Sequence, residues 1–274
     1  MSLILCGLLK VCLPNEGGYN YLMGGVDIKM MQLIRAEFYK LFKSPAYGVM
    51  LALSVGVGVF FAVFGISHGT SAGGYQMLPV MDSFVLFHSI FACAFTAVFL
   101  CGEFSGRTMG MGLLCGLPRS RVFSAKLIVH FVGLLFLLTA VVMTPMAIMT
   151  YANGFGMALT VQSCMEVLEQ MLFFWLVSSA LGGCAIFLTM ATKNAVATIG
   201  IGIGLVYLLL MMTSNYINSG VEKYYPAKYT VVYQMFVLAD WEHLQKGLFL
   251  EVSLVTLILT LAASTLLFEK AELK

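Results

Sequence analysis

Long uncharged runs, separated by few charged residues, restrict the fold of this chain more than any other feature of its sequence. Only 10% of the 274 residues are charged and 60% are apolar, and the mean hydropathy is +0.94. A soluble domain has roughly a quarter of its residues charged, whereas a helix needs about 20 mostly apolar residues to cross about 30 Å of hydrocarbon. The sequence therefore excludes an ordinary soluble domain and predicts an all-α, polytopic membrane protein.

Six of the uncharged runs are long enough to cross a bilayer. The run after Lys43 is interrupted by the turn-forming residues 68–74, which end the first span. Asp82 and Glu103 enclose 20 uncharged residues, so the second span has hardly more residues than a crossing helix needs. Pro145 predicts a kink late in the third span. The six predicted transmembrane helices are residues 46–67, 83–102, 122–150, 169–192, 195–214 and 248–268.

Two further segments precede the first span. Residues 31–44 carry apolar side chains on one helical face, with basic residues elsewhere around the turn. This pattern predicts an interfacial helix, called the elbow here, that lies on the membrane surface. Residues 1–30 are expected to be a disordered extension or an over-long start, so the predicted permease domain is 31–274.

The basic residues are distributed unevenly between the two sides of the membrane. If the elbow is cytoplasmic, eleven of the fifteen Lys and Arg residues lie on the cytoplasmic side. The outer side then holds only Lys223, Lys228 and Lys246. Because cytoplasmic loops carry an excess of Lys and Arg, this asymmetry predicts that both termini are cytoplasmic.

No constellation of residues indicates an enzyme, a metal site or a nucleic-acid surface. The chain lacks a G-x-x-x-x-G-K-[ST] phosphate loop and an H-E-x-x-H motif. Its seven cysteines form no C-x-x-C pair, and its net charge is only +2. The sequence thus predicts no catalytic residue, no bound metal and no nucleic-acid partner.

A few polar and small residues leave alternatives open. Glu166 and Glu169 could bind a cation, but a solvated helix N-terminus is favoured. His88 and His130 lie in apolar runs, and the sequence does not decide whether they act in transport. Small residues at 179, 183 and 200–204 permit close helix approach, with packing inside the chain favoured over a dimer seam.

The loop between the second and third spans contains an apolar pattern that a solvated connector would not need. Met109, Leu113 and Leu117 recur every four residues before Pro118, which predicts a short helix with one apolar face. This helix could rest on the membrane or dock into the groove of a partner. Ser120 is placed to cap the third span.

The same loop carries a resemblance to a known family. The pattern Glu103-Phe104, Arg107-Thr108, Leu113-Leu114 and Arg119-x-Arg121-Val-Phe-x-x-Ala125-Lys126 is similar to the signature that follows the second span in type-2 ATP-binding-cassette (ABC) exporter permeases. Pro118 and Arg119-Ser-Arg121 depart from the usual pattern, so the matching Arg is ambiguous.

Two further segments extend the resemblance over residues 31–274. Arg35-Ala-Glu-Phe-Tyr-Lys-Leu-Phe-Lys-Ser44 resembles the N-terminal elbow of these permeases. Phe268-Glu-Lys-Ala-Glu-Leu-Lys274 resembles the ending of a Gram-positive branch associated with bacitracin and lantibiotic resistance.

The resemblance implies a permease of the bacterial cell membrane that pairs with a second copy or a related subunit. A separate ABC ATPase would bind ATP and Mg, so this chain itself would bind no cofactor. The elbow residues implied to face the ATPase are Arg35, Glu37, Phe38 and Lys40. The loop residues implied to couple to it are Glu103, Phe104, Arg107, Thr108, Met109, Leu113 and Leu117.

The cargo is suggested by what the spans lack. Their central parts contain no Asp, Glu, Lys or Arg, which favours a hydrophobic or amphipathic substrate, such as a peptide antibiotic, over a hydrated ion or sugar. A six-span carrier or channel without an ATPase is the alternative. An outer aromatic set could gate the exit or simply anchor the chain at the interface; it comprises Tyr224, Tyr225, Tyr229, Tyr233 and Trp241.

Overall fold

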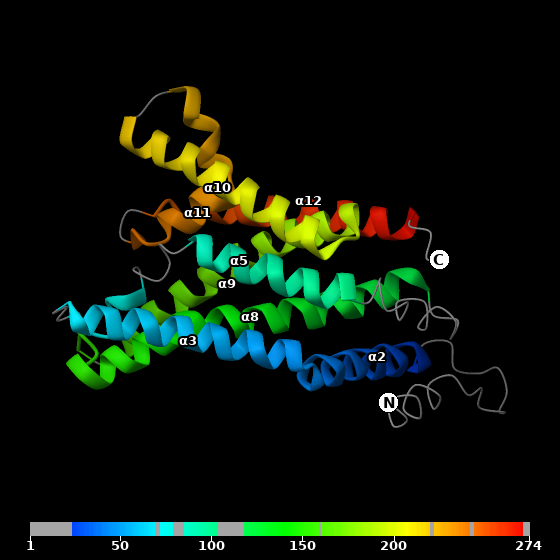
Figure 1. Cartoon of the computed structure of the whole chain (residues 1–274), viewed down its shortest axis with the longest axis horizontal. Helices are drawn as coiled ribbons and strands as arrows, with labels where there is room; N and C mark the ends of the chain where they lie inside the picture. The colour runs from blue at the N-terminus through cyan, green and yellow to red at the C-terminus, as the bar shows by residue number, and fades with distance from the viewer. Residues whose placement is uncertain are drawn as a thin grey trace.

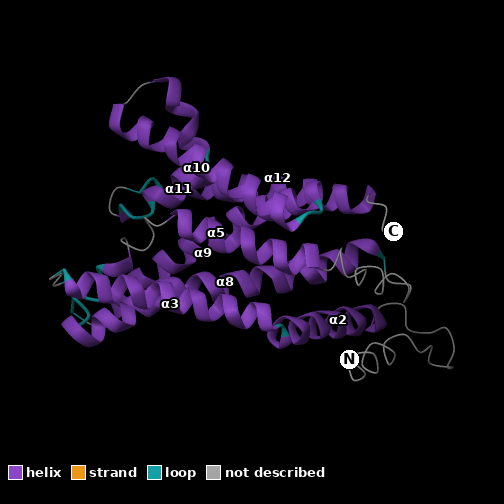
Figure 2. Cartoon of the chain, in the orientation of Figure 1, coloured by secondary structure: helices purple, strands orange, loops and turns teal. Residues whose placement is uncertain are grey.

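Helices and short turns make up the whole of the chain that the computed structural model describes, with no strand among these residues (Figure 2). The described residues are 24–68, 72–78, 85–102, 118–158, 160–219, 222–241 and 244–270. The fold is therefore all-α in the described ranges, as predicted. The predicted coupling residues 103–117 lie outside them.

Five described helices are long and apolar enough to cross a membrane. They are α3 (Pro45–Ser67), α8 (Arg119–Asn153), α9 (Val161–Thr192), α10 (Ala195–Ser219) and α12 (Lys246–Lys270). They correspond to the first, third, fourth, fifth and sixth predicted spans. The central helices α8 and α9 have the largest share of buried residues, whereas few residues of α3, α10 and α12 are buried, as expected for helices that face lipid.

The second predicted span, 83–102, is described only from residue 85 onward. It forms α5 (Val85–Thr96), of 12 residues, and a π-helical segment η1 (Ala97–Cys101), of 5 residues. Together these are shorter than the roughly 20 residues that a crossing helix needs. The structure thus contains five helices of spanning length in its described part, and a sixth crossing stays a prediction.

The helices pack mainly in pairs that are distant in sequence. The largest pairings join α9 with α12 and α3 with α8, followed by α5 with α10. In Figure 1, α3 runs alongside α8, and the shorter helix α2 (Gly24–Lys43) continues along the same side of the bundle. Helix α2 contains the predicted elbow and begins earlier than the expected start at residue 31.

Glycines make these pairings close. A Cβ atom on Gly58 of α3 would lie 2.8 Å from Thr144 Cβ of α8, and one on Gly183 of α9 would lie 2.5 Å from Thr260 Oγ1 of α12. On α10, a Cβ on Gly202 would meet Cys93 Sγ of α5 at 2.6 Å, whereas Gly200 and Gly204 face open space. Packing within the chain therefore accounts for Gly183 and Gly202.

The bundle has two distinct ends. Helix α2 and the C-terminal end of α12 lie at one end (Figure 1), which we call the elbow end. Helix α8 starts there at Arg119, so Ser120 lies inside its first turn and does not cap it; Pro118 occupies the N-cap position. The starts of α9 and α12 form the opposite, distal end, with η2 (Glu222–Tyr229) and α11 (Val231–Val237) beside them.

Candidate functional site

The inward face of α2 carries a carboxylate between two apolar residues. Leu33, Glu37 and Leu41 are spaced by four residues and all three are buried, so they form one stripe along the helix. Leu33 packs with Val122 and Ala125 of α8. The stripe presses the acidic side chain of Glu37 against the first turns of α8, where an apolar side chain would be the ordinary choice.

Glu37 is held there by two lysines. Its Oε1 accepts hydrogen bonds from Nζ of Lys126 at 3.0 Å and from Nζ of Lys40 at 2.9 Å. Glu37 is 3% exposed and Lys126 only 2%. Among the described residues, Oε2 of Glu37 has no hydrogen-bond partner. The ion pair between Glu37 and Lys126 therefore joins α2 to α8 almost entirely out of water.

Two opposing effects set the ionisation of Glu37. Burial raises the pKa of its carboxyl, and the positive charges of Lys126 and Lys40 lower it by more, so the pKa lies below the ordinary value of 4.5. Glu37 is consequently ionised at neutral pH. Breaking the pair with Lys126 would remove one of the two charges that keep it so.

The other predicted elbow residues lie in different surroundings. Arg35 is exposed. Phe38 is half-buried, packs against the core and stacks on Phe42 with ring centroids 6.2 Å apart. Lys40 is partly exposed and bonded to Glu37. Helix α2 thus leaves Arg35 exposed, while Glu37 and Phe38 fasten the helix to its own bundle.

A second connection at the elbow end joins two motifs that the sequence keeps far apart. Nη1 of Arg119, at the start of α8, donates to the carbonyl oxygen of Glu269, near the end of α12, at 3.1 Å. Phe123 stacks on Phe268 with ring centroids 4.8 Å apart. The start of α8 is therefore tied to both α2 and α12.

The end of α5 is tied to α8 through His130. Thr96 Oγ1 lies 2.8 Å from His130 Nε2 and donates to the carbonyl oxygen of Ala92 at 2.7 Å. Because a hydroxyl has one proton to donate, His130 Nε2 is the donor in their contact. The His130 ring also stacks on Phe95. His88 is buried with its ring edge-to-face against Phe174, so both histidines sit in aromatic packing.

The predicted exit aromatics whose side chains are described are Tyr229 in η2, Tyr233 in α11 and Trp241. Tyr229 is exposed in η2, and Tyr233 of α11 contacts Tyr216 of α10 with centroids 5.8 Å apart. Trp241 instead packs against Phe173 of α9 at 5.3 Å. Tyr224 and Tyr225 lie in η2, but their side chains are outside the described set.

Glu166 and Glu169, the two acidic residues of α9, each have a polar partner at the distal end. Nζ of Lys246 lies 2.7 Å from Oε1 of Glu169 and 4.6 Å from the Trp241 ring centroid. Glu166 accepts from Gln162 at 3.3 Å. Within the described ranges, no three His, Cys, Asp or Glu side chains gather to hold a metal ion.

Sequence reasoning missed Lys126 as a site residue, although it closes the motif quoted above. The missing signal was its partner, which lies 89 positions away. The predicted coupling residues Glu103, Phe104, Arg107, Thr108, Met109, Leu113 and Leu117 fall outside the described residues. Their flanking residues Gly102 and Pro118 end η1 and precede α8, at the elbow end.

Comparison with known protein families gives a match over most of the chain. A sequence model for a family described as "ABC-2 family transporter protein" matches residues 33–211. The matched part includes most of α2, reaches into α10 and contains both Glu37 and Lys126. No curated protein matches the chain at a significant level.

Proposed function

We propose that this chain, which belongs to the ABC-2 transporter family, is the membrane-spanning permease subunit of an ATP-driven exporter. Family membership and the apolar helices make it a multi-pass membrane transport protein. The proposal adds the direction of transport, the partner and the class of cargo.

The observation that carries the proposal is the buried contact between Glu37 and Lys126. It fastens α2 to the start of α8, immediately after the predicted coupling segment 103–117. Arg119 and Phe123 fasten the same part of α8 to the end of α12. A force applied at the elbow end would therefore move α2, α8 and α12 together, because buried contacts resist separate movement.

The partner that applies this force is an ABC ATPase, which supplies the ATP and Mg sites that this chain lacks in its sequence. Exposed Arg35 and the predicted helix at 103–117 are the surfaces that we assign to it. Charged residues would set the register of docking, and buried apolar anchors such as Phe104 would provide most of the affinity. A second copy or a related permease completes the transporter.

The cargo that we propose is a hydrophobic or amphipathic molecule, with membrane-active peptide antibiotics as the first class to test. In the described spans, charged residues occur toward the helix ends, among them Arg119 and Lys126 in α8, Glu166 and Glu169 in α9, and Glu251 in α12. A wall without central charges suits an amphiphile better than a hydrated ion, which would lose its water without replacement.

The test compares resistance in cells that express the permease with and without an active partner. The ABC ATPase that co-purifies with the tagged permease from its native membranes is co-expressed, either intact or with its phosphate-loop Lys replaced by Ala. Cells with the intact pair should survive at least fourfold higher doses of nisin or bacitracin. Unchanged resistance together with an ATP-independent sodium or sugar flux would instead support the carrier alternative.

A further inference from the structure

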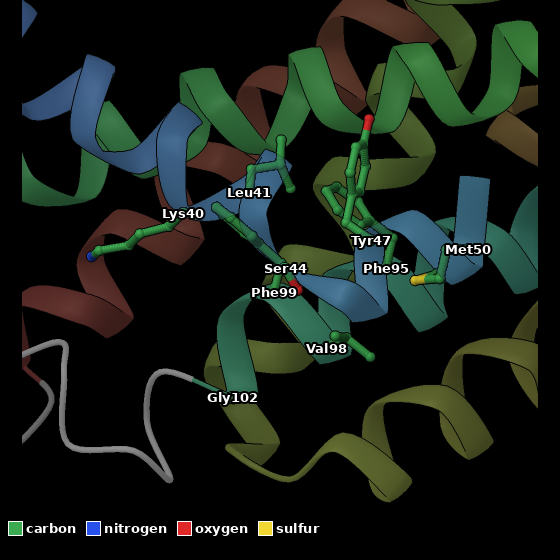
Figure 3. Close-up of a pocket in the computed structure, with 9 residues that line it drawn as sticks. All are labelled: Lys40, Leu41, Ser44, Tyr47, Met50, Phe95, Val98, Phe99 and Gly102. Atoms are coloured by element: carbon green, nitrogen blue, oxygen red, sulfur yellow. The ribbon is translucent and has the colours of Figure 1, made fainter. Parts of the chain in front are cut away.

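A cavity of about 160 Å³ lies where the elbow helix meets the first span (Figure 3). Its walls come from the end of α2, the first turns of α3 and the α5–η1 helix. The side chains that matter for its chemistry are Ser44, Tyr47, Met50, Phe95, Val98 and Phe99. The ion pair of Glu37 with Lys126 is not part of this lining.

The walls of the cavity are largely apolar. The Tyr47 hydroxyl donates to the carbonyl oxygen of Gly133 at 3.1 Å, and Figure 3 shows it directed away from Met50 and Val98. No carboxylate occurs among the described lining residues, and the ammonium of Lys40 is bonded to Glu37. An apolar protein cavity of about 150 Å³ can stay dry and accept benzene, so this one suits a hydrocarbon segment of similar size.

The cavity opens beside exposed apolar side chains. Val98 lines it and is 44% exposed. On α3, Val49 and Leu53 flank the lining residue Met50 along the sequence and are themselves exposed. In a membrane such uncovered apolar side chains contact acyl chains, so the occupant with direct access to the cavity is a lipid.

One basic residue, Lys40, lines the cavity, and Lys43 adjoins the lining residue Ser44 in the sequence. Lys43 is exposed and directly precedes Ser44, and Arg35 is exposed on the same helix. Basic residues on an interfacial helix attract anionic headgroups over zwitterionic ones. These basic residues therefore favour lipids with anionic headgroups over lipids with zwitterionic ones.

We propose that this cavity binds an anionic phospholipid of the bilayer. One acyl chain inserts between Met50, Phe95 and Val98, and the phosphate lies beside Lys43. The bound lipid fills the junction between the elbow and the first span. The inference needs α3 to lie in the membrane but does not depend on the cargo or on an ATPase.

Photoactivatable lipids test the site in the full-length protein. The permease is placed in nanodiscs that contain either phosphatidylglycerol or phosphatidylcholine, each with a diazirine on one acyl chain. After illumination, labelled peptides are mapped by mass spectrometry. Peptides covering 44–50 and 95–102 should be labelled about fivefold more by phosphatidylglycerol, the preference expected for one basic residue near the surface.

Two pairs of matched variants test where the acyl chain and the headgroup of the lipid bind. Val98→Trp fills the cavity and should reduce labelling of both peptides at least fivefold, whereas Ile128→Trp, at a residue of similar exposure on α8, should not. Lys43→Gln should bring the preference for phosphatidylglycerol close to one. Lys193→Gln removes an exposed charge in the turn between α9 and α10 and should leave it unchanged.

Three results would overturn the proposal. The first is equal labelling of these peptides by both lipids in the wild-type protein. The second is unchanged labelling in Val98→Trp, which would indicate lipid at the general surface only. The third is displacement of the label by nisin at concentrations that leave other labelled peptides unaffected, since the cavity would then admit cargo. Lys43→Gln alters only an exposed side chain, so it remains informative if Val98→Trp fails to fold.

Discussion

Lys126 Nζ lies 3.0 Å from Oε1 of Glu37 and joins two helices through residues that are 89 positions apart. Both charged groups are buried, and burying them costs solvation free energy. The net contribution of the pair to stability is therefore small compared with the cost of removing one partner. Such a pair specifies how α2 sits on α8 more than it stabilises the fold.

Replacing one partner should therefore cost more than replacing both. We expect Lys126→Met to lower the free energy of unfolding in mixed micelles by about 2 kcal/mol, because a charge-assisted hydrogen bond to a buried carboxylate is lost. The double variant Glu37→Leu with Lys126→Met should recover at least half of that loss. Arg35→Gln, at an exposed position of the same helix, should change stability by less than about 0.5 kcal/mol. If the losses of unfolding free energy from the two single substitutions add in the double variant, a buried ion pair between Glu37 and Lys126 is contradicted.

The stabilising contribution of the Glu37–Lys126 ion pair should persist in mild acid. The pKa of Glu37 is lowered on folding, so its contribution to stability is fully present above the ordinary value of 4.5 and is lost as pH falls through the lower, folded value. The stability difference between wild type and Glu37→Gln should stay constant from about pH 7 to pH 5 and shrink below about pH 4.5. Unfolding measured across this range checks it; a difference that already falls between pH 7 and pH 5 would show a raised pKa.

Gly58 should be intolerant of a side chain because α3 and α8 touch there. Its added Cβ would lie 2.8 Å from Thr144 Cβ and 2.9 Å from Pro145 Cδ. We expect Gly58→Ala to destabilise the protein by about 1–3 kcal/mol through overpacking. Gly56→Ala, on the same helix with nothing within 4 Å, should be neutral or slightly stabilising. The melting temperatures of the two variants in detergent distinguish them, and similar values would mean that α3 lies elsewhere.

Cys164 gives a direct test of membrane orientation. It is exposed near the start of α9, at the distal end, which the positive-inside rule places outside the cell. A membrane-impermeant maleimide should label intact cells, and Cys164→Ala should remove this label. In that background, Asn194→Cys, at an exposed turn on the elbow end, should be labelled only after permeabilisation. Labelling of residue 194 in sealed cells would reverse the predicted topology.

The predicted coupling helix can be tested through its anchor and its charge. Phe104→Ala and Arg107→Glu should each weaken binding of the ATPase roughly tenfold, since a buried aromatic anchor or a complementary charge typically contributes 1 kcal/mol or more. ATP-driven transport should fall in parallel while membrane insertion is unchanged. Phe136→Ala removes an exposed ring from α8 and is the control. Normal ATPase binding by both Phe104→Ala and Arg107→Glu would indicate that residues 103–117 rest on the membrane surface and do not contact the ATPase.

Local sequence properties determined most of the fold. Apolar length and turn residues placed α3, α8, α9, α10 and α12 close to their observed positions, because each helix satisfies its own backbone and needs only its own residues to be apolar. The same reasoning predicted a helix over residues 31–44, and α2 covers 31–43 of them, whereas its place at the membrane surface stays a prediction. The second predicted span is described from residue 85 onward as α5 and η1, and its crossing of the membrane stays a prediction.

Only the tertiary structure decided which residues meet. The sequence offered Gly200, Gly202 and Gly204 as equivalent, yet only Gly202 faces α5, since the rotation of a helix is set by its neighbours. It likewise showed Glu37 as one charge on an amphipathic helix. That Glu37 is buried against Lys126 depends on how α2 and α8 pack, and hydropathy, being a property of each segment alone, contains no information about the partner across an interface.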